Sequence, residues 1–215
     1  MDASLYVILD RGAARGRDLM DLLDAVIAGG GRMVQLREKE WPSGRLFPLA
    51  ERLRARCAAA GVTFVVNDRV DLALAVRADG VHLGQDDLPA RAARPLLPDG
   101  MILGISTHSV AQARAARADG ADYIAVGSMF PTTTKREFQL VGPPLLRELR
   151  GEVRVPLIGI GGITHDNVHE VIAAGADGVA VISAVCAADD PRAATERFVA
   201  LIRAARGLTA SRPTL

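Results

Sequence analysis

Three polar side chains spaced by two residues occur near the start of the chain. Gln35, Arg37 and Lys39 belong to the segment VQLREK, and Val34 and Leu36 occupy the alternate positions. Because successive side chains of an extended strand point to opposite faces, the amide and the two cations share one face. Such a face suits an anionic ligand. An exposed edge strand would also carry charges, but the apolar alternate positions favour a strand that is buried on its other side.

Acidic residues follow two later apolar runs. Asn67 and Asp68 close the segment TFVVND, and Asp87 closes the segment GVHLGQDD. Carboxylates that face Arg and Lys suit an octahedral Mg²⁺, which keeps several waters and takes its remaining ligands from substrate phosphates. Taken alone, Asn-Asp before a helix is more often an N-cap than a metal ligand, and Asp68 could do no more than cap the helix that follows it. We predict a metal site because both carboxylates are expected to converge on the cationic face.

Two later loops predict a second anion site. The segment FPTTTK, residues 130–135, follows the apolar run YIAVG. In GIGGIT, Gly161 and Gly162 precede a helix that Thr164 is expected to cap, and Ser183 ends the run GVAVIS. Glycine lets backbone N–H groups face an anion, and phosphate commonly binds to the last two loops of a β/α barrel. These loops therefore predict a site for a single phosphate.

The elements that must position these residues alternate along the chain. Apolar runs rich in β-branched residues predict strands at 5–9, 33–37, 63–67, 80–84, 102–106, 123–127, 155–161 and 178–183. Helical periodicity predicts helices at 16–28, 44–60, 69–77, 109–118, 143–150, 165–174 and 191–205. Alternation of this kind with short connections predicts a parallel sheet with right-handed crossovers.

We therefore predict an α/β fold, a single (β/α)8 TIM barrel over residues 1–206, with a mobile tail over residues 207–215. An open doubly wound sheet is the alternative, but no strand is followed by a Gly-x-Gly-x-x-Gly turn. A barrel gathers the polar residues that end its strands, Ser106 among them, at one mouth. Three joints, RADGVHLG, RADGADYIAVG and AAGADGVAVIS, each contain a glycine expected to end a helix in the left-handed conformation.

Composition gives no reason to expect a nucleic acid or a membrane as partner. The 215 residues carry a net charge of +1 and no apolar stretch long enough to span a bilayer, so we expect no nucleic-acid or membrane partner and a cytoplasmic location. Cys57 and Cys186 fit no metal or redox spacing and are expected to be buried thiols. His165 and His169 are expected on a solvated helix face, and His82 to be a hydrogen-bonded packing residue. The sequence is compatible with a homo-oligomer but does not fix the oligomeric state.

Six segments, in this order, resemble the thiamine-phosphate synthase family. They are VQLREK, NDRVDLALAVRADGVHLGQDDLP, GISTHS, FPTTTK, IGIGGIT and DGVAVISAV, and they cover nearly the whole chain. The resemblance implies a transferase that couples 4-amino-2-methyl-5-hydroxymethylpyrimidine diphosphate with 4-methyl-5-hydroxyethylthiazole phosphate, or its carboxylated form. The products would be thiamine monophosphate and pyrophosphate, and the cofactor would be Mg²⁺.

The resemblance also implies roles for individual residues. The pyrimidine diphosphate would be bound by Gln35, Leu36, Arg37, Glu38, Lys39, Asn67, Ser106 and Lys135. Mg²⁺ would be bound by Asp68 and Asp87. The thiazole phosphate would be bound by Thr132, Thr133, Thr134, Gly162, Ile182 and Ser183. The catalytic groups, acting on a dissociative loss of pyrophosphate before the thiazole nitrogen attacks, would be Arg37, Lys39, Ser106 and Lys135.

Two alternatives remain at this point. A thiazole tautomerase of the same superfamily would share the barrel and the thiazole-phosphate site, but it has no need of QLREK, ND and QDD. A non-catalytic protein that binds thiamine phosphates would need the same anion sites. The chain also departs from the family pattern at Gly127-Ser128-Met129, where Gly-Pro is frequent, and in the segment REFQLVGPP, which affects details of thiazole binding.

Overall fold

The computed structural model describes residues 1–132 and 139–210. Its strands form a closed barrel in sequence order, in which β1 pairs with both β2 and β8 and all pairs are parallel. The strands are β1 Leu5–Asp10, β2 Met33–Arg37, β3 Thr63–Asn67, β4 Gly80–Leu83, β5 Ile102–Thr107, β6 Tyr123–Gly127, β7 Leu157–Ile160 and β8 Gly178–Val181. The expected TIM barrel is confirmed, and the open sheet is excluded.

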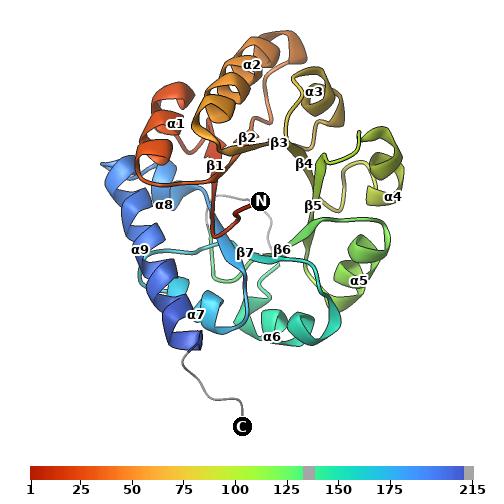
Figure 1. The fold of residues 1–215 in the computed structure, drawn as a ribbon, viewed down its shortest axis with the longest axis vertical. Coiled ribbons are helices and arrows are strands. Elements are labelled where there is room, and N and C mark those ends of the chain that lie inside the picture. The colour runs from red at the N-terminus through yellow and green to blue at the C-terminus, as the bar shows by residue number, and fades with distance from the viewer. Residues whose placement is uncertain (133–138, 211–215) are drawn as a thin grey trace.

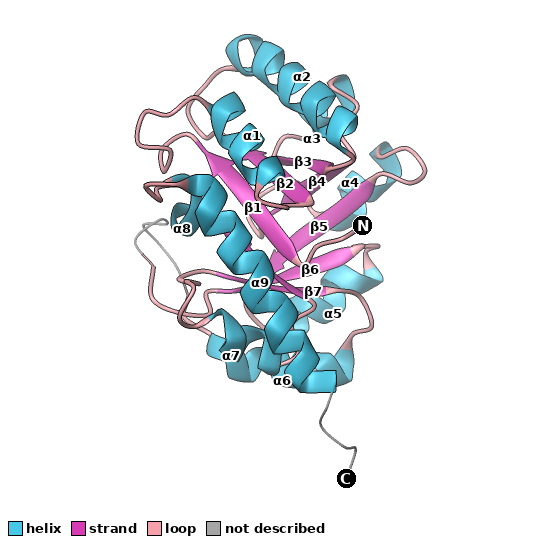
Figure 2. Cartoon of the chain, turned by 60° about the vertical axis from the view of Figure 1, so that its left-hand side comes forward, coloured by secondary structure: helices cyan, strands magenta, loops and turns pink. Residues whose placement is uncertain are grey.

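Helices cover the outside of the barrel on all sides (Figures 1 and 2). They are α1 Leu19–Ala28, α2 Ser43–Ala60, α3 Val70–Ala75, α4 Ala90–Ala93, the 3₁₀ helix η1 Arg94–Leu96, α5 Val110–Ala118, α6 Gly142–Glu152, α7 Val168–Ala173, α8 Ser183–Cys186 and α9 Pro191–Ala210. None of the helices among the described residues combines the length and the apolar character that crossing a membrane requires.

Several helix ends differ from expectation, and hydrogen bonds to the caps explain two of them. The first helix begins at Leu19 rather than at 16, because the Asp18 carboxylate accepts the N–H of Met20 at 2.7 Å. Thr164 does not cap α7; its own N–H donates to Asn167 Oδ1 at 2.8 Å within a turn that precedes the helix. The last helix extends past residue 205 to Ala210, so residues 207–210 are helical, whereas residues 211–215 of the expected tail lie outside the described residues.

The glycine joints are confirmed in two cases and wrong in one. Gly120 and Gly175 adopt φ of 90° and 103°, as expected for left-handed residues that end a helix. In the first joint the left-handed residue is Arg77, with φ of 52°. Gly80 belongs to β4 instead, where a Cβ would lie 2.8 Å from the carbonyl oxygen of Ile102. This glycine therefore permits close strand packing rather than a turn.

At the amino-terminal end of the barrel, the same hydrogen bond from a strand N–H to an aspartate occurs three times. An aspartate directly before an even-numbered strand accepts a backbone N–H from the preceding strand at 2.8 Å. The pairs are Asp79 with Phe64, Asp122 with Leu103 and Asp177 with Leu157. Each aspartate also forms an ion pair with an arginine, namely Arg54, Arg94 and Arg150 respectively. Three acids thus tie neighbouring strands together at the end opposite the expected site.

The core has two layers. The larger layer lies between the strands and the helices and contains the outward side chains of the strands, such as Leu36 and Leu103. The smaller layer fills the barrel interior and includes Tyr6, Val65 and Tyr123. Gly104 makes this interior possible, because a Cβ at that position would lie 2.0 Å from the Tyr123 ring.

Candidate active site

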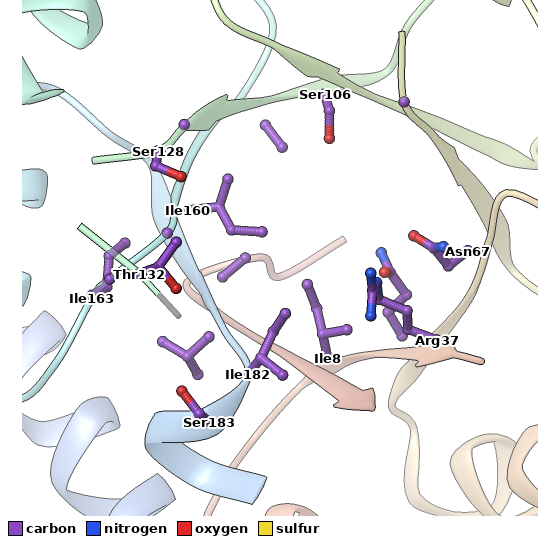
Figure 3. A pocket seen from close by; sticks show the side chains of 18 of the residues that line it. Ile8, Arg37, Asn67, Ser106, Ser128, Thr132, Ile160, Ile163, Ile182 and Ser183 are labelled. Carbon is purple, nitrogen blue, oxygen red and sulfur yellow. The ribbon is translucent and has the colours of Figure 1, made fainter. Parts of the chain in front are cut away.

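A cavity of about 1140 Å³ opens at the carboxyl ends of the strands. Every strand, or the loop directly after it, contributes to its lining. Polar side chains gather on two sides (Figure 3), with Arg37 and Asn67 on one side and Thr132 and Ser183 on the other. Apolar side chains, among them Ile160, lie between the two polar sides. The cavity is large enough for two small molecules that meet at their apolar parts.

The cations of the first polar side are held by carboxylates. Arg37 ends β2 and forms an ion pair with Asp10, the residue beside it at the end of β1. Asp10 also accepts the N–H of Ala13 at 2.9 Å, which fixes its carboxylate. Lys39 forms an ion pair with Asp68. The strand alternation therefore places Arg37 at the cavity, whereas Lys39 lies two residues beyond the end of β2 and is held by its ion pair with Asp68. Asp10 is a positioning residue that the sequence did not indicate.

The two expected metal ligands lie together. Asp87 is within hydrogen-bonding reach of Asp68 and accepts the N–H of Gly84 at 2.7 Å. Burial raises the pKa of Asp68 above its usual value of 3.8; Lys39 lowers that pKa, and the neighbouring Asp87 raises it again. Two carboxylates held this close repel each other when both are ionised, and a divalent cation would relieve that repulsion.

The backbone of Asp68 favours a functional role over helix capping. Its φ is 61°, in a region that non-glycine residues seldom occupy. The α3 helix begins after Arg69, and no side chain caps it. Since the Asp68 carboxylate turns toward Lys39 and Asp87, the capping alternative is wrong. Across residues 1–132 and 139–210, no group of three or more His, Cys, Asp or Glu side chains could hold a metal, so a cation at this pair needs further ligands from a substrate.

A chain of hydrogen bonds leads from the cavity into the barrel interior. Gln35 Nε2 donates to Tyr6 Oη at 2.5 Å, and Tyr6 Oη lies 3.0 Å from Tyr123 Oη. His82 lies between Tyr123 Oη, 2.9 Å from its Nδ1, and Ser106 Oγ, 2.8 Å from its Nε2. The expected hydrogen-bonded role of His82 is confirmed. Both ends of the chain, Gln35 and Ser106, line the cavity.

Close backbone contact shapes the glycine loop on the second polar side. Gly161 and Gly162 have φ of 97° and 65°, and a Cβ on Gly162 would lie 2.4 Å from the carbonyl oxygen of Pro131. The Phe130 N–H donates to the Gly161 carbonyl at 3.0 Å. The loops after β6 and β7 therefore pack directly against each other, and both line the cavity.

The remaining residues of the second side come from three segments. Thr132 lines the cavity after β6, and Ile182 and Ser183 line it at the start of α8. Arg15, in the loop after β1, also lines it, although nothing in its spacing pointed to the site. The loop that carries Arg15 contacts α8, because Arg17 donates to the carbonyl of Cys186 at 3.1 Å. Thr133, Thr134 and Lys135 lie outside the described residues, so their expected roles stay predictions.

Two of the expected binding side chains do not face the cavity. Leu36 points outward into the core between strands and helices, as its alternate position dictates. Glu38 accepts Arg11 Nε at 2.5 Å and the N–H of Glu40 at 2.7 Å, so its carboxylate faces its own loop. Glu38 therefore orders the segment that carries Lys39 rather than lining the site.

The cysteines and His165 do not belong to the site. Cys57 and Cys186 are buried and free, as expected. Burial raises the pKa of Cys57 to about 12 and that of Cys186 to about 11, so neither is a thiolate near neutral pH. His165 is not on a solvated helix face; its Nε2 lies 3.0 Å from the carbonyl oxygen of Ala194 and its ring packs on Phe198.

Comparison with known proteins agrees with this geometry. The family model described as thiamine monophosphate synthase matches residues 5–185. A thiamine-phosphate synthase from Moorella thermoacetica is 48% identical over 207 residues, which cover 94% of this chain and 97% of that protein. A thiamine-phosphate synthase from Haloquadratum walsbyi is 49% identical over 196 residues, 90% of this chain and 88% of the relative. Among solved structures, a thiamine phosphate pyrophosphorylase from Pyrococcus furiosus is 37% identical, with a TM-score of 0.88 over 95% of this chain and 97% of its own.

Proposed function

Since the chain belongs to the thiamine monophosphate synthase family and is a transferase of thiamine biosynthesis, we propose that the two polar sides of its cavity bind its two phosphorylated substrates. The observation that carries the proposal is the separation of these sides by an apolar strip. One side offers paired carboxylates and cations, and the other offers glycine backbone and hydroxyl groups. The pyrimidine diphosphate and the thiazole phosphate need these two kinds of partner respectively.

On the first side, Arg37, Lys39 and Asn67 bind the pyrimidine diphosphate. Arg37 keeps its position through Asp10, so its guanidinium is oriented before the substrate arrives. Lys39 is half-exposed, and its partner Asp68 can exchange this ion pair for a metal. Groups held in place in this way stabilise the negative charge that develops on departing pyrophosphate, and loss of one such donor typically lowers the rate by ~10²–10³.

The metal of the reaction fits the carboxylate pair, and we propose Mg²⁺. Asp68 and Asp87 would supply two oxygen ligands, and diphosphate oxygens and waters would complete an octahedral set. When bound, Mg²⁺ neutralises charge on the diphosphate and makes pyrophosphate a better leaving group. Lys39, released from Asp68, then remains as a further cation for the diphosphate.

On the second side, the thiazole phosphate binds to Gly162 and to the hydroxyl groups of Thr132 and Ser183, while Ile182 packs on the ring. The support for this placement is that the glycine loop, the loop after β6 and the start of α8 line one end of the cavity. We further place Thr133 and Thr134 at this phosphate and Lys135 at the diphosphate, because the same short segment contains all of them.

The chemistry needs no protein nucleophile. Loss of pyrophosphate from the methylene carbon leaves a cation that the amino group of the pyrimidine stabilises, and the thiazole nitrogen then forms the new C–N bond. The protein has to hold the two reactants in line and stabilise the leaving group. The buried, un-ionised cysteines are consistent with this route.

Measurement of product against Mg²⁺ concentration tests the proposal. The wild-type protein is expected to form thiamine monophosphate and pyrophosphate from both substrates, and Asp87→Asn is expected to lose about 10²-fold or more in turnover at limiting Mg²⁺. Asp71→Asn is the matched control, because Asp71 lies outside the cavity lining in a surface ion pair with Arg69. An unchanged Mg²⁺ response in Asp87→Asn would remove this residue from the metal site.

The alternative functions lack comparable support. A tautomerase would not need the paired carboxylates, and a binding protein would not turn over, whereas the relatives that cover almost the whole chain are synthases. We place the enzyme in the cytoplasm, where reduced thiols such as Cys57 and Cys186 are the rule. Tautomerase activity without coupling, in the assay above, would reverse this choice of function.

A further inference from the structure

The hydrogen bonds in the barrel interior run in one donor-to-acceptor direction, and this direction decides whether Ser106 donates or accepts at the cavity. We propose that Tyr6 and Tyr123 fix His82 in the tautomer that has its proton on Nε2. Ser106 then accepts a hydrogen bond from His82 and donates its own hydroxyl hydrogen bond to the pyrimidine diphosphate. The proposal deepens the proposed function, since it rests on Gln35 and Ser106 facing that substrate.

The series of hydrogen bonds begins at a group that can only donate. The amide nitrogen of Gln35 carries hydrogens and has no acceptor capacity, so Tyr6 Oη accepts at 2.5 Å. The hydroxyl group of Tyr6 then donates a hydrogen bond to Tyr123 Oη, 3.0 Å away. Both tyrosines are fully buried, and burial raises the pKa of each above 10.0, so each keeps its proton.

The direction continues through His82. Because Tyr123 accepts from Tyr6, it donates its own proton to His82 Nδ1 at 2.9 Å. A neutral imidazole that accepts at Nδ1 carries its proton on Nε2, and that nitrogen lies 2.8 Å from Ser106 Oγ. The His82 ring stacks on the Tyr123 ring with centroids 5.6 Å apart, which holds the imidazole in the orientation that this pairing requires.

With the Gln35 amide nitrogen toward Tyr6, the opposite direction leaves one proton without an acceptor. If His82 Nδ1 carried the proton, Tyr123 would accept from it and would donate to Tyr6. Tyr6 would then receive two hydrogen bonds, and within the described part of the chain its own buried proton would have no acceptor. Buried donors are almost always paired in native proteins, and these residues leave no buried side-chain polar atom without a partner.

Two groups are left for the substrate. Ser106 Oγ accepts from His82, so its hydroxyl proton is available to the cavity, where Figure 3 shows the side chain at the wall. Gln35 uses its amide nitrogen on Tyr6, so its carbonyl oxygen is available as an acceptor for the amino group of the pyrimidine. The interior tyrosines never touch substrate; they are positioning residues that decide which cavity groups donate and which accept.

The direct test measures the tautomer. The ¹⁵N chemical shifts of the imidazole distinguish a protonated ring nitrogen from an unprotonated one, and the chain contains only four histidines. His82→Gln assigns the signal by removing it. We expect Nε2–H in the wild-type protein near neutral pH, and observation of Nδ1–H or of a doubly protonated ring would overturn the proposal without any tyrosine variant.

Variants test whether Tyr123 acts on the reaction through His82 and Ser106. Tyr123→Phe is expected to convert the His82 signals to those of mixed tautomers and to lower kcat about tenfold, with a smaller change in KM for the pyrimidine diphosphate. Tyr6→Phe should shift the His82 signals in the same direction but less far, because Tyr123 loses the donor that orients it and can still donate to His82. In a Ser106→Ala background, Tyr123→Phe should cost little more, whereas independent, multiplicative losses would contradict action through Ser106.

The proposal and the proposed function can fail separately. Circular dichroism establishes that each variant is folded before its kinetics are read. If the wild-type protein forms no thiamine monophosphate, the proposed function fails, while the ¹⁵N measurement still decides the direction of the hydrogen-bond chain. If product forms but His82 carries its proton on Nδ1, only the inference fails.

Discussion

Arg15 differs from the other cations of the cavity. Arg37 and Lys39 are each paired with a carboxylate, whereas Arg15 forms neither an ion pair nor a hydrogen bond within the described part of the chain. Its φ of 51° is unusual for a residue with a side chain. We expect this cation, which lines the cavity together with residues of α8, to meet the anionic end of the thiazole phosphate.

We therefore expect Arg15→Gln to raise KM for the thiazole phosphate about tenfold, the loss of one charged contact. KM for the pyrimidine diphosphate should change little, since Arg37 and Lys39 remain. Steady-state kinetics with each substrate varied in turn measures both constants. Arg32→Gln, an exposed arginine outside the cavity, is the control. An equal rise in both KM values would contradict a specific role for Arg15.

Single residues differed in how far the sequence could place them. Arg37 was predictable because alternation along β2 fixes the direction of its side chain. Lys39 lies beyond the strand, and its ion pair with Asp68 holds it at the cavity. Asp10 was not predictable, because its role comes from its register beside Arg37 on another strand. The orientation of the Glu38 side chain depends likewise on another loop, since its carboxylate accepts a hydrogen bond from Arg11.

At the scale of the elements, the loop between β2 and α2 depends on one carboxylate. Glu38 is almost fully buried, with 3% of its side chain exposed. Its carboxylate accepts Arg11 and the N–H groups of Glu40 and Trp41. Burial raises its pKa, but these N–H groups and the Arg11 charge together bring the pKa below the usual 4.5.

Glu38→Gln should therefore lower the free energy of unfolding by about 1–2 kcal/mol near neutral pH. A carboxyl group whose folded pKa lies below its unfolded value stabilises the protein above the unfolded pKa, and the effect disappears as the pH falls through the folded one. The difference between wild type and variant should thus shrink as the pH falls below 4.5. Urea unfolding at several pH values measures it, and a difference that did not depend on pH would show that the charge is not responsible.

Strands were easier to predict than helices. The strands are short apolar segments that are mostly buried on both sides, so apolar runs in the sequence mark them. The segment ARAARPLL lacks a clear period, because Pro95 breaks it into α4 and η1, and neither was expected. Helix α7 begins at Val168 rather than at the expected residue 165, because Thr164 and Asn167 form a turn that the local sequence pattern does not reveal.

On the scale of the whole molecule, the two ends of the barrel divide stability from function. The acids at the amino-terminal end, such as Asp122, are paired with strand N–H groups and arginines. The acids at the other end lie against each other around a cavity. Barrel closure itself was predictable from the number of strands, but this repeated bracing depends on contacts between neighbouring β/α units.

Asp122 allows the two parts of that bracing to be separated. Asp122→Ala leaves the buried N–H of Leu103 without its acceptor, so we expect a loss of about 1–3 kcal/mol in the free energy of unfolding. Asp122→Asn keeps an acceptor and loses only the ion pair with Arg94, so its loss should be below about 1 kcal/mol. Urea denaturation compares the two variants, and equal losses would contradict the dominance of the N–H contact.

The single tryptophan of the chain lies in the loop ordered by Glu38. Two guanidinium groups contact its indole, with Arg45 at 3.7 Å and Arg11 at 5.3 Å from the ring centroid. The same loop carries Lys39, whose ammonium group we expect to leave Asp68 when the diphosphate and metal bind. Trp41 is therefore a natural fluorophore in the loop that carries Lys39, and we expect its emission to change when the first polar side is occupied.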